Sequence, residues 1–189
     1  CFVIGSLLFV PLTREYVIYL ILLFCMMLSG YLDDASDKPW SDYKKGLIDL
    51  IISAVTMWTF VSCNSTDIVL GTLVITIPKI LYFVLGIVLI WVSVNVVNCS
   101  DGVDGLCANM WSVALIGFSV IFGETLGEYA LANYLFVAVT FAYLCFNSSP
   151  SSMLMGDAGS RAFGFYLAVI AMKSGNPFAY ILLAGMLII

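Results

Sequence analysis

Residues 80–97 read ILYFVLGIVLIWVSVNVV, an uninterrupted apolar run that decides how this chain can fold. A helix needs about 20 mostly apolar residues to cross a bilayer, because lipid offers no hydrogen-bond partner to an unpaired peptide group. Pro78, just before the run, is typical of a helix start. The stretch therefore predicts a membrane-spanning helix.

Similar apolar runs lie on both sides of this stretch. They cover 16–32, 47–63, 105–122, 129–146, 158–173 and 177–189, with 1–10 as the tail of a further span. Only 10% of the 189 residues are charged, whereas about a quarter are charged in a soluble domain, and no polar linker divides the chain. We expect an all-α, polytopic membrane helical bundle of about seven spans. We also expect 1–189 to be one domain, truncated at both ends, because the chain opens on Cys1 and stops inside an apolar run.

Acidic segments interrupt the apolar sequence at three places. They are Asp33-Asp34, the DGVD segment at 101–104 and the GDAGS segment at 156–160. Each segment follows a predicted span, namely 16–32, 80–97 and 129–146. From the end of one of these spans to the end of the next, the chain crosses the membrane twice. The count therefore places all three segments on one membrane face, here called face X. Face X also carries four basic residues against three on the opposite face, so the positive-inside rule favours a cytoplasmic face X by a small margin.

A metal bound by this chain would have to be held by oxygen ligands. The chain has no histidine, and its six cysteines lack CxxC spacing. The adjacent carboxylates of Asp33 and Asp34 suit a divalent cation or a phosphate bound through one, and a solvated acidic loop is the alternative. Lys44 and Lys45 can meet a phosphate or an anionic headgroup, or can serve only as interfacial anchors.

The segment Asn95 to Gly105 combines amides, carboxylates and glycines. Asn95 and Asn98 are three residues apart and so share a helix face, while Gly102 permits a tight turn beside Asp101 and Asp104. Such a turn can hold the polar edges of a nucleotide, and a capped Asx-turn is the simpler reading.

Asp157 lies where the next span begins. It can be an ordinary helix N-cap. It can also hold the Mg²⁺ that neutralises a diphosphate bound at the helix N-terminus, and both readings can hold together.

Three motifs together resemble those of the polyprenyl-phosphate N-acetylhexosamine-1-phosphate transferases. They are GYLDD (30–34), NVVNCSDGVDGL (95–106) and MGDAGSRAFGF (155–165), and the resemblance extends from about residue 16 to the end of the chain. It implies a ten-helix fold in which Asp157 is the catalytic Mg²⁺ ligand and Asp33 and Asp34 are the catalytic pair that engages the lipid phosphate. The substrate-binding residues that we expect are Asn95, Asn98, Asp101, Gly102, Asp104, Lys44 and Lys45.

The branch of this family that the chain resembles most transfers phospho-N-acetylmuramoyl-pentapeptide. The resemblance implies a UDP-linked donor, undecaprenyl phosphate as acceptor, lipid I and UMP as products, Mg²⁺ as cofactor and a role in peptidoglycan synthesis. It also implies a multi-pass protein of the bacterial inner membrane with its site on the cytoplasmic face. No nucleic-acid partner is expected, and a homodimer stays open.

The sequence departs from the family pattern at one basic position and leaves other functions open. Asp37 stands where the family has a lysine three residues after the Asp pair, so the basic role can pass to Lys38, Lys44 or Lys45. A sister enzyme that transfers GlcNAc-1-phosphate is the nearest alternative. More distant ones are an intramembrane prenyltransferase, suggested by the DDxxD spacing at 33–37, and a cation transporter.

Overall fold

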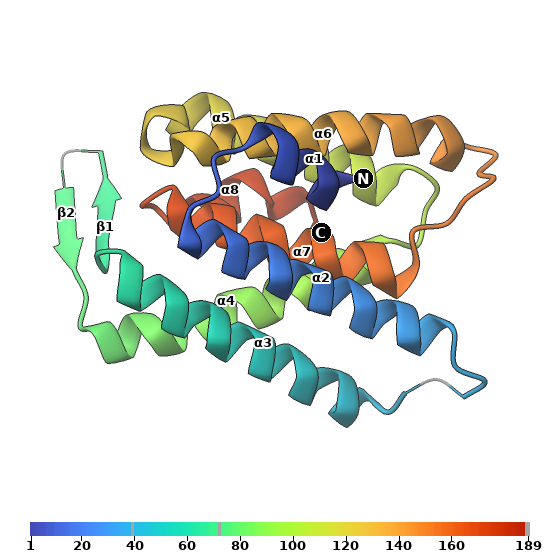
Figure 1. Cartoon of the computed structure of the whole chain (residues 1–189), viewed down its shortest axis with the longest axis horizontal. Helices are drawn as coiled ribbons and strands as arrows, with labels where there is room; N and C mark the ends of the chain where they lie inside the picture. The colour runs from blue at the N-terminus through green and yellow to red at the C-terminus, as the bar shows by residue number, and fades with distance from the viewer. Residues whose placement is uncertain (39, 72, 188–189) are drawn as a thin grey trace.

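Long helices run alongside one another in the computed structural model, which describes residues 1–38, 40–71 and 73–187 (Figure 1). In chain order they are α1 (Phe2–Phe9), α2 (Arg14–Asp34), α3 (Asp42–Cys63), α4 (Lys79–Ser100), α5 (Leu106–Leu126), α6 (Glu128–Asn147), α7 (Gly156–Lys173) and α8 (Ala179–Leu183). A short 3-10 helix, Gly185–Leu187, follows α8. The predicted all-α bundle is confirmed.

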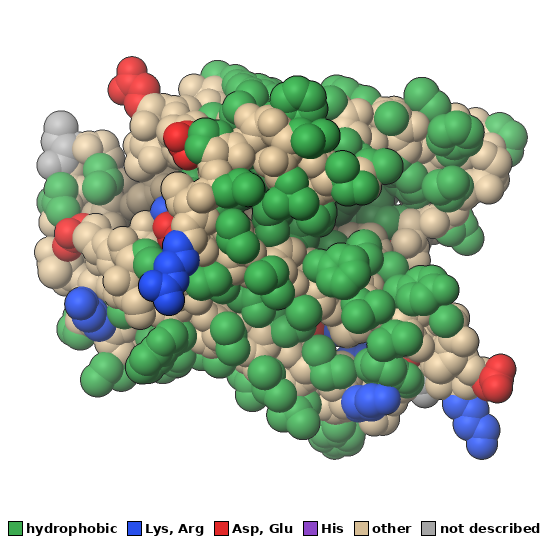
Figure 2. Space-filling view, in the orientation of Figure 1, with side chains coloured by type: hydrophobic (Ala, Val, Ile, Leu, Met, Phe, Trp, Pro, Cys, Tyr) green, Lys and Arg blue, Asp and Glu red, His purple; other side chains and the backbone are tan. Residues whose placement is uncertain are grey.

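Five of the described helices, α2 to α6, are long and apolar enough to cross a membrane. Hydrophobic side chains are spread over the visible surface, whereas charged side chains gather toward its two ends (Figure 2). This distribution is what a bilayer requires, because an ionised side chain is costly in the hydrocarbon region.

Helix α7 is the centre of the bundle. It packs against α2, α4 and α5, and all of its residues from Ser160 to Met172 are buried. Its contact with α4 is close, since a Cβ atom added to Gly164 would lie 2.6 Å from the Ser93 carbonyl oxygen. The Ser93 hydroxyl donates a hydrogen bond of 2.6 Å to the Gly164 carbonyl. Arg161, the charged residue within this buried stretch, therefore faces protein and not lipid.

The predicted last span is wrong over the residues that the structure describes. Within 177–189 the chain forms the five-residue α8 and then the 3-10 helix, and 188–189 lie outside the described residues. Gly185 interrupts the apolar run, and glycine is a poor residue for a helix interior.

A β-hairpin that the sequence reading did not predict joins α3 to α4. Strand β1 (Asp67–Leu70) pairs antiparallel with β2 (Leu73–Thr76), and Gly71 at the turn has a positive φ of 63°. The Val69 N–H donates to the Gly175 carbonyl at 2.9 Å, which fixes the hairpin to the C-terminal end of α7. The β-branched residues around Gly71 are the signal that could have indicated it.

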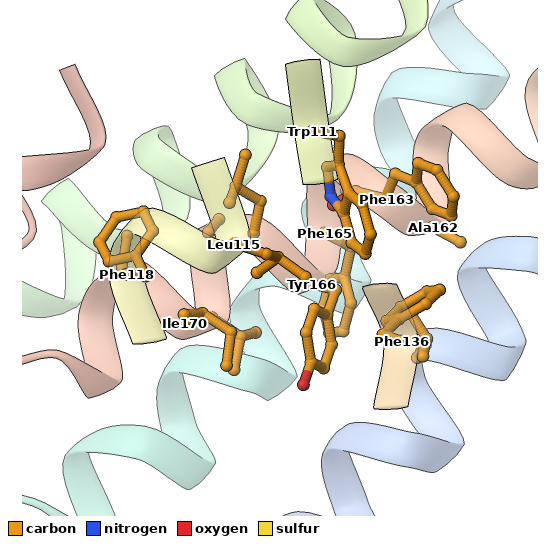
Figure 3. Close-up of a cluster of buried hydrophobic side chains, with 14 of the residues drawn as sticks. Trp111, Leu115, Phe118, Phe136, Ala162, Phe163, Phe165, Tyr166 and Ile170 are labelled. Carbon is orange, nitrogen blue, oxygen red and sulfur yellow. The ribbon is translucent and has the colours of Figure 1, made fainter. Parts of the chain in front are cut away.

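Aromatic rings fill the core between α5, α6 and α7 (Figure 3). Trp111 is fully buried, its ring stacks on Phe163 with centroids 4.1 Å apart, and its Nε1–H donates to the Phe163 carbonyl at 2.9 Å. Phe136 meets the same indole edge-on at 4.6 Å.

Replacing Trp111 with Ala is expected to lower the free energy of unfolding by about 3–5 kcal/mol, because the void cannot close around a removed indole. Thermal unfolding of the purified protein in detergent measures the effect. Trp58 is 72% exposed, so Trp58→Ala is the matched control and should shift stability by less than about 1 kcal/mol. Equal shifts for the two variants would contradict this account of the core.

Candidate active site

The three acidic segments converge at one end of the bundle, as the crossing count predicts. Asp33 and Asp34 form the last turn of α2, and Asp157 lies in the first turn of α7. One carboxylate oxygen from each residue lies within 4.8 Å of the other two. Asp33 is buried, whereas Asp34 is exposed, so the cluster opens to solvent on one side.

Lys45, in the first turns of α3, is the cation at the centre of this cluster. Its ammonium group forms an ion pair with Asp33 and lies 3.1 Å from Oδ2 of Asp157. The other oxygen of Asp33 accepts a hydrogen bond from the Trp40 N–H at 2.6 Å. Of the three lysines that the sequence offered, the structure brings Lys45 to the carboxylates.

Asn98 and the N-terminus of α7 fix two further carboxylate oxygens. The Asn98 amide donates to Oδ1 of Asp157 and to the Ser160 hydroxyl, each at 2.9 Å. The Ala158 N–H donates to Oδ2 of Asp34 at 3.3 Å. The end of α4 is thus connected to the start of α7, and the start of α7 to the end of α2.

Asp101 and Asp104 lie in the turn between α4 and α5, and Asp101 borders the cluster. Burial, together with the nearby carboxylates of Asp157 and Asp34, raises the pKa of Asp101 to about 6. Asp104 accepts hydrogen bonds from the Ser151 N–H at 3.1 Å and from its hydroxyl at 2.7 Å. Asp104 therefore holds the loop that leads to Asp157.

Three other predicted substrate-binding residues likewise form no hydrogen bond or ion pair with the carboxylates in the described part of the chain. Asn95 is exposed and donates to the Trp91 carbonyl of its own helix at 2.7 Å, so it does not share the partners of Asn98. The Lys44 ammonium lies 3.3 Å from the centroid of the Trp40 ring. Gly102 is exposed, with no neighbour near a Cβ position among the described residues. Their roles in substrate binding stay predictions.

The sequence reading missed one buried ion pair directly beneath the cluster. Arg161 of α7 pairs with Asp49 of α3, and each side chain is only 3% exposed. The signal was available, because an ionisable residue inside an apolar span, as Asp49 is, points to a partner within the bundle.

Comparisons with known proteins agree with this geometry. The profile described as "Glycosyl transferase family 4" matches residues 16–175. A phospho-N-acetylmuramoyl-pentapeptide-transferase of Treponema pallidum is 32% identical over 92% of this chain and 54% of its own length. A protein of the same name from Microcystis aeruginosa is 32% identical over 97% of this chain and 54% of its own length. The chain spans about half the length of these curated relatives, and it belongs to glycosyl transferase family 4.

Proposed function

We propose that the full-length protein transfers phospho-N-acetylmuramoyl-pentapeptide from its UDP-linked donor to undecaprenyl phosphate, with lipid I and UMP as products. The observation that carries the proposal is the convergence of Asp33, Asp34 and Asp157 around Lys45 at one end of a membrane bundle of this family. The relatives that match nearly the whole chain bear the name of this transferase. We place the cluster on the cytoplasmic face, where nucleotide-linked sugars are supplied.

The cluster fits Mg²⁺ by its charge and by its atoms. Three carboxylates form the cluster and one ammonium group pairs with two of them, so negative charge remains uncompensated. One carboxylate oxygen from each of the three residues lies within 4.8 Å of the other two, so a single small divalent cation would be within reach of all three. Asp157 would hold the ion, with Asp33 and Asp34 in reach, and bound Mg²⁺ would offset the charge of a diphosphate.

In the proposed reaction an oxygen of the lipid phosphate attacks the phosphorus that bears the sugar. A new P–O bond forms, the bond to the UMP oxygen breaks, and UMP leaves with the electron pair. The carboxylates of Asp33 and Asp34 orient the attacking phosphate and accept its proton if it arrives protonated. Lys45 pairs with a phosphate oxygen, which keeps two anions together in one site.

Asn98 and the first turn of α7 position these groups. Asn98 holds Asp157 through Oδ1, which leaves Oδ2 directed at Lys45. The N–H groups at the start of α7 favour negative charge where the diphosphate would lie. Asp101 lies beside the same carboxylates, and we expect both Asp101 and Asp104 to contact the uridine part of the donor.

Two of the alternatives lose support. A prenyltransferase usually carries its acidic motifs on helix bodies, and a cation pathway places carboxylates near mid-bilayer, whereas the carboxylates here lie at helix ends. Family membership also favours the transfer of a phospho-sugar. The sister reaction with GlcNAc-1-phosphate differs only in the donor, and experiment separates the two.

The test uses the purified full-length protein with undecaprenyl phosphate and either UDP-N-acetylmuramoyl-pentapeptide or UDP-GlcNAc. We expect UMP and a lipid-linked product from the first donor only, complete loss of both with EDTA, and recovery with Mg²⁺. Selective use of UDP-GlcNAc would assign the protein to the sister reaction. Absence of UMP with both donors would refute the proposal.

A further inference from the structure

Helices α3 and α7 meet through charged side chains. Helix α7 packs chiefly against α2 and α4, and α3 packs chiefly against the same two helices. Two ion pairs connect α3 to α7 directly, namely Lys45 with Asp157 and Asp49 with Arg161. The direct connection between α3 and α7 therefore includes two ion pairs made by long charged side chains.

The order of positive and negative charge along α3 is the reverse of the order along α7. Lys45 and Asp49 are four residues apart on α3, and Asp157 and Arg161 are four apart on α7, so each pair of residues shares one helix face. A slip of one turn, about 6 Å along the axis, would place Lys45 beside Arg161 or Asp49 beside Asp157. Both alternatives bring like charges together in a poorly solvated interior, so the charge order excludes both slips.

A contribution to stability is a poor explanation for the Asp49–Arg161 pair. The side chains of Asp49 and Arg161 are 3% exposed, whereas those of Lys45 and Asp157 are 28% and 24% exposed. Removing two charges from water is costly, and apolar residues of similar size often stabilise such a layer as well or better. Arg161 Nη1 is also buried without a hydrogen-bond partner among the described residues, which adds to the cost. Conformational specificity is a better explanation for the pair.

We propose that the Asp49–Arg161 pair is a positioning device that holds α3 and α7 in the one register in which Lys45 reaches both Asp33 and Asp157. The pair touches no reacting group and acts through Lys45 and Asp157, which lie one turn above it. By fixing the Asp157 carboxylate and its counter-ion, it sets the affinity of the site for its divalent cation. The inference rests on the proposed function of Asp157 as the metal ligand.

The test removes both charges together, so that the net charge beneath the site does not change. The full-length double variant D49L/R161L is expected to unfold at or above the wild-type temperature in detergent. Its Kd for Mn²⁺, measured by electron paramagnetic resonance, should rise about tenfold, the size of effect typical when the support of a metal ligand is lost. The Mg²⁺ concentration for half-maximal activity should rise equally, with kcat at saturating Mg²⁺ within about threefold of wild type. Wild-type Mn²⁺ affinity in this folded variant would overturn the proposal.

Two further variants keep the result interpretable. D49N/R161Q preserves size and polarity if the leucine variant fails to fold, and we expect the same rise in the Kd for Mn²⁺; an unchanged Kd would overturn the proposal. The matched control is E15Q/K173M, which removes the ion pair at the far end of α2 and α7, where the two groups lie 3.1 Å apart. The control should lose stability and keep its Mn²⁺ affinity. An equal loss of affinity in the control would mean that the effect is not specific to the Asp49–Arg161 pair, and would contradict the positioning role.

The variant Asp157→Asn separates the failure of this inference from that of the proposed function. Loss of Mn²⁺ binding in Asp157→Asn together with normal binding in D49L/R161L would reject the positioning role alone. Normal Mn²⁺ binding in Asp157→Asn would reject the metal assignment, and the positioning role with it.

Discussion

Replacing Asp157 with Asn in the full-length protein is expected to lower kcat by about 10³-fold, because charge stabilisation by a bound metal is worth several kcal/mol and each 1.36 kcal/mol is tenfold in rate. The amide keeps the size of the side chain and its hydrogen bond with Asn98, but it is a weak ligand for Mg²⁺. Lys45 would also lose one of its two anionic partners. Release of UMP at saturating donor and lipid measures the loss.

Asp37→Asn is the matched control for this variant. Asp37 is an exposed carboxylate three residues after Asp34, so its removal changes the net charge at the same face by the same amount. We expect a change in kcat of less than about twofold, since exposed charges are screened by solvent and salt. If both variants kept normal Mg²⁺-dependent turnover, Asp157 would not be the metal ligand.

The arrangement of the site was predictable because it depends on the number of crossings. Apolar runs locate the helices to within a few residues, as 80–97 within α4 shows. An even number of crossings then returns the chain to the same face, so Asp33, Asp101 and Asp157 had to lie on one face if the spans were counted correctly. Hydropathy determines this count, whatever the details of side-chain packing.

The identity of the central cation was not predictable from hydropathy. Lys38, Lys44 and Lys45 are equally basic in sequence, and the choice depends on where α3 begins and how it is rotated. The apolar run starts near residue 47, whereas the helix begins at Asp42, so Lys44 and Lys45 lie on the helix and point in different directions. Lys44 turns to Trp40, and Lys45 turns to the carboxylates.

The buried partner of Arg161 depends on the same rotation. Asp49 is one helical turn after Lys45, and only the three-dimensional register of α3 against α7 shows that it meets Arg161. The sequence pattern indicates that an acidic residue inside a span needs a partner, but it cannot choose among the basic residues of the chain.

Replacing Gly30 with Ala is expected to reduce turnover by about 100-fold or more, since a misplacement of about 1 Å at reacting groups can cost that much. Gly30 lies one turn before Asp33 and Asp34, where α2 crosses the start of α7. A Cβ atom at this position would lie 2.5 Å from the carbonyl carbon of Asp157 and 2.7 Å from the Ala158 nitrogen. These are backbone atoms, which cannot rotate away, so the two helices must separate and draw the three carboxylates apart.

Gly123→Ala provides the matched control, because it is the same substitution inside α5. A Cβ atom at Gly123 meets nothing within 4 Å among the described residues, so Ala adds no clash beside the kink of α5 at Phe122. We expect Gly123→Ala to unfold close to the wild-type temperature with unchanged turnover, and Gly30→Ala to lose both stability and Mn²⁺ affinity. If Gly30→Ala bound Mn²⁺ and released UMP like the wild type, the close approach of α2 and α7 would not be what sets the spacing of Asp33, Asp34 and Asp157.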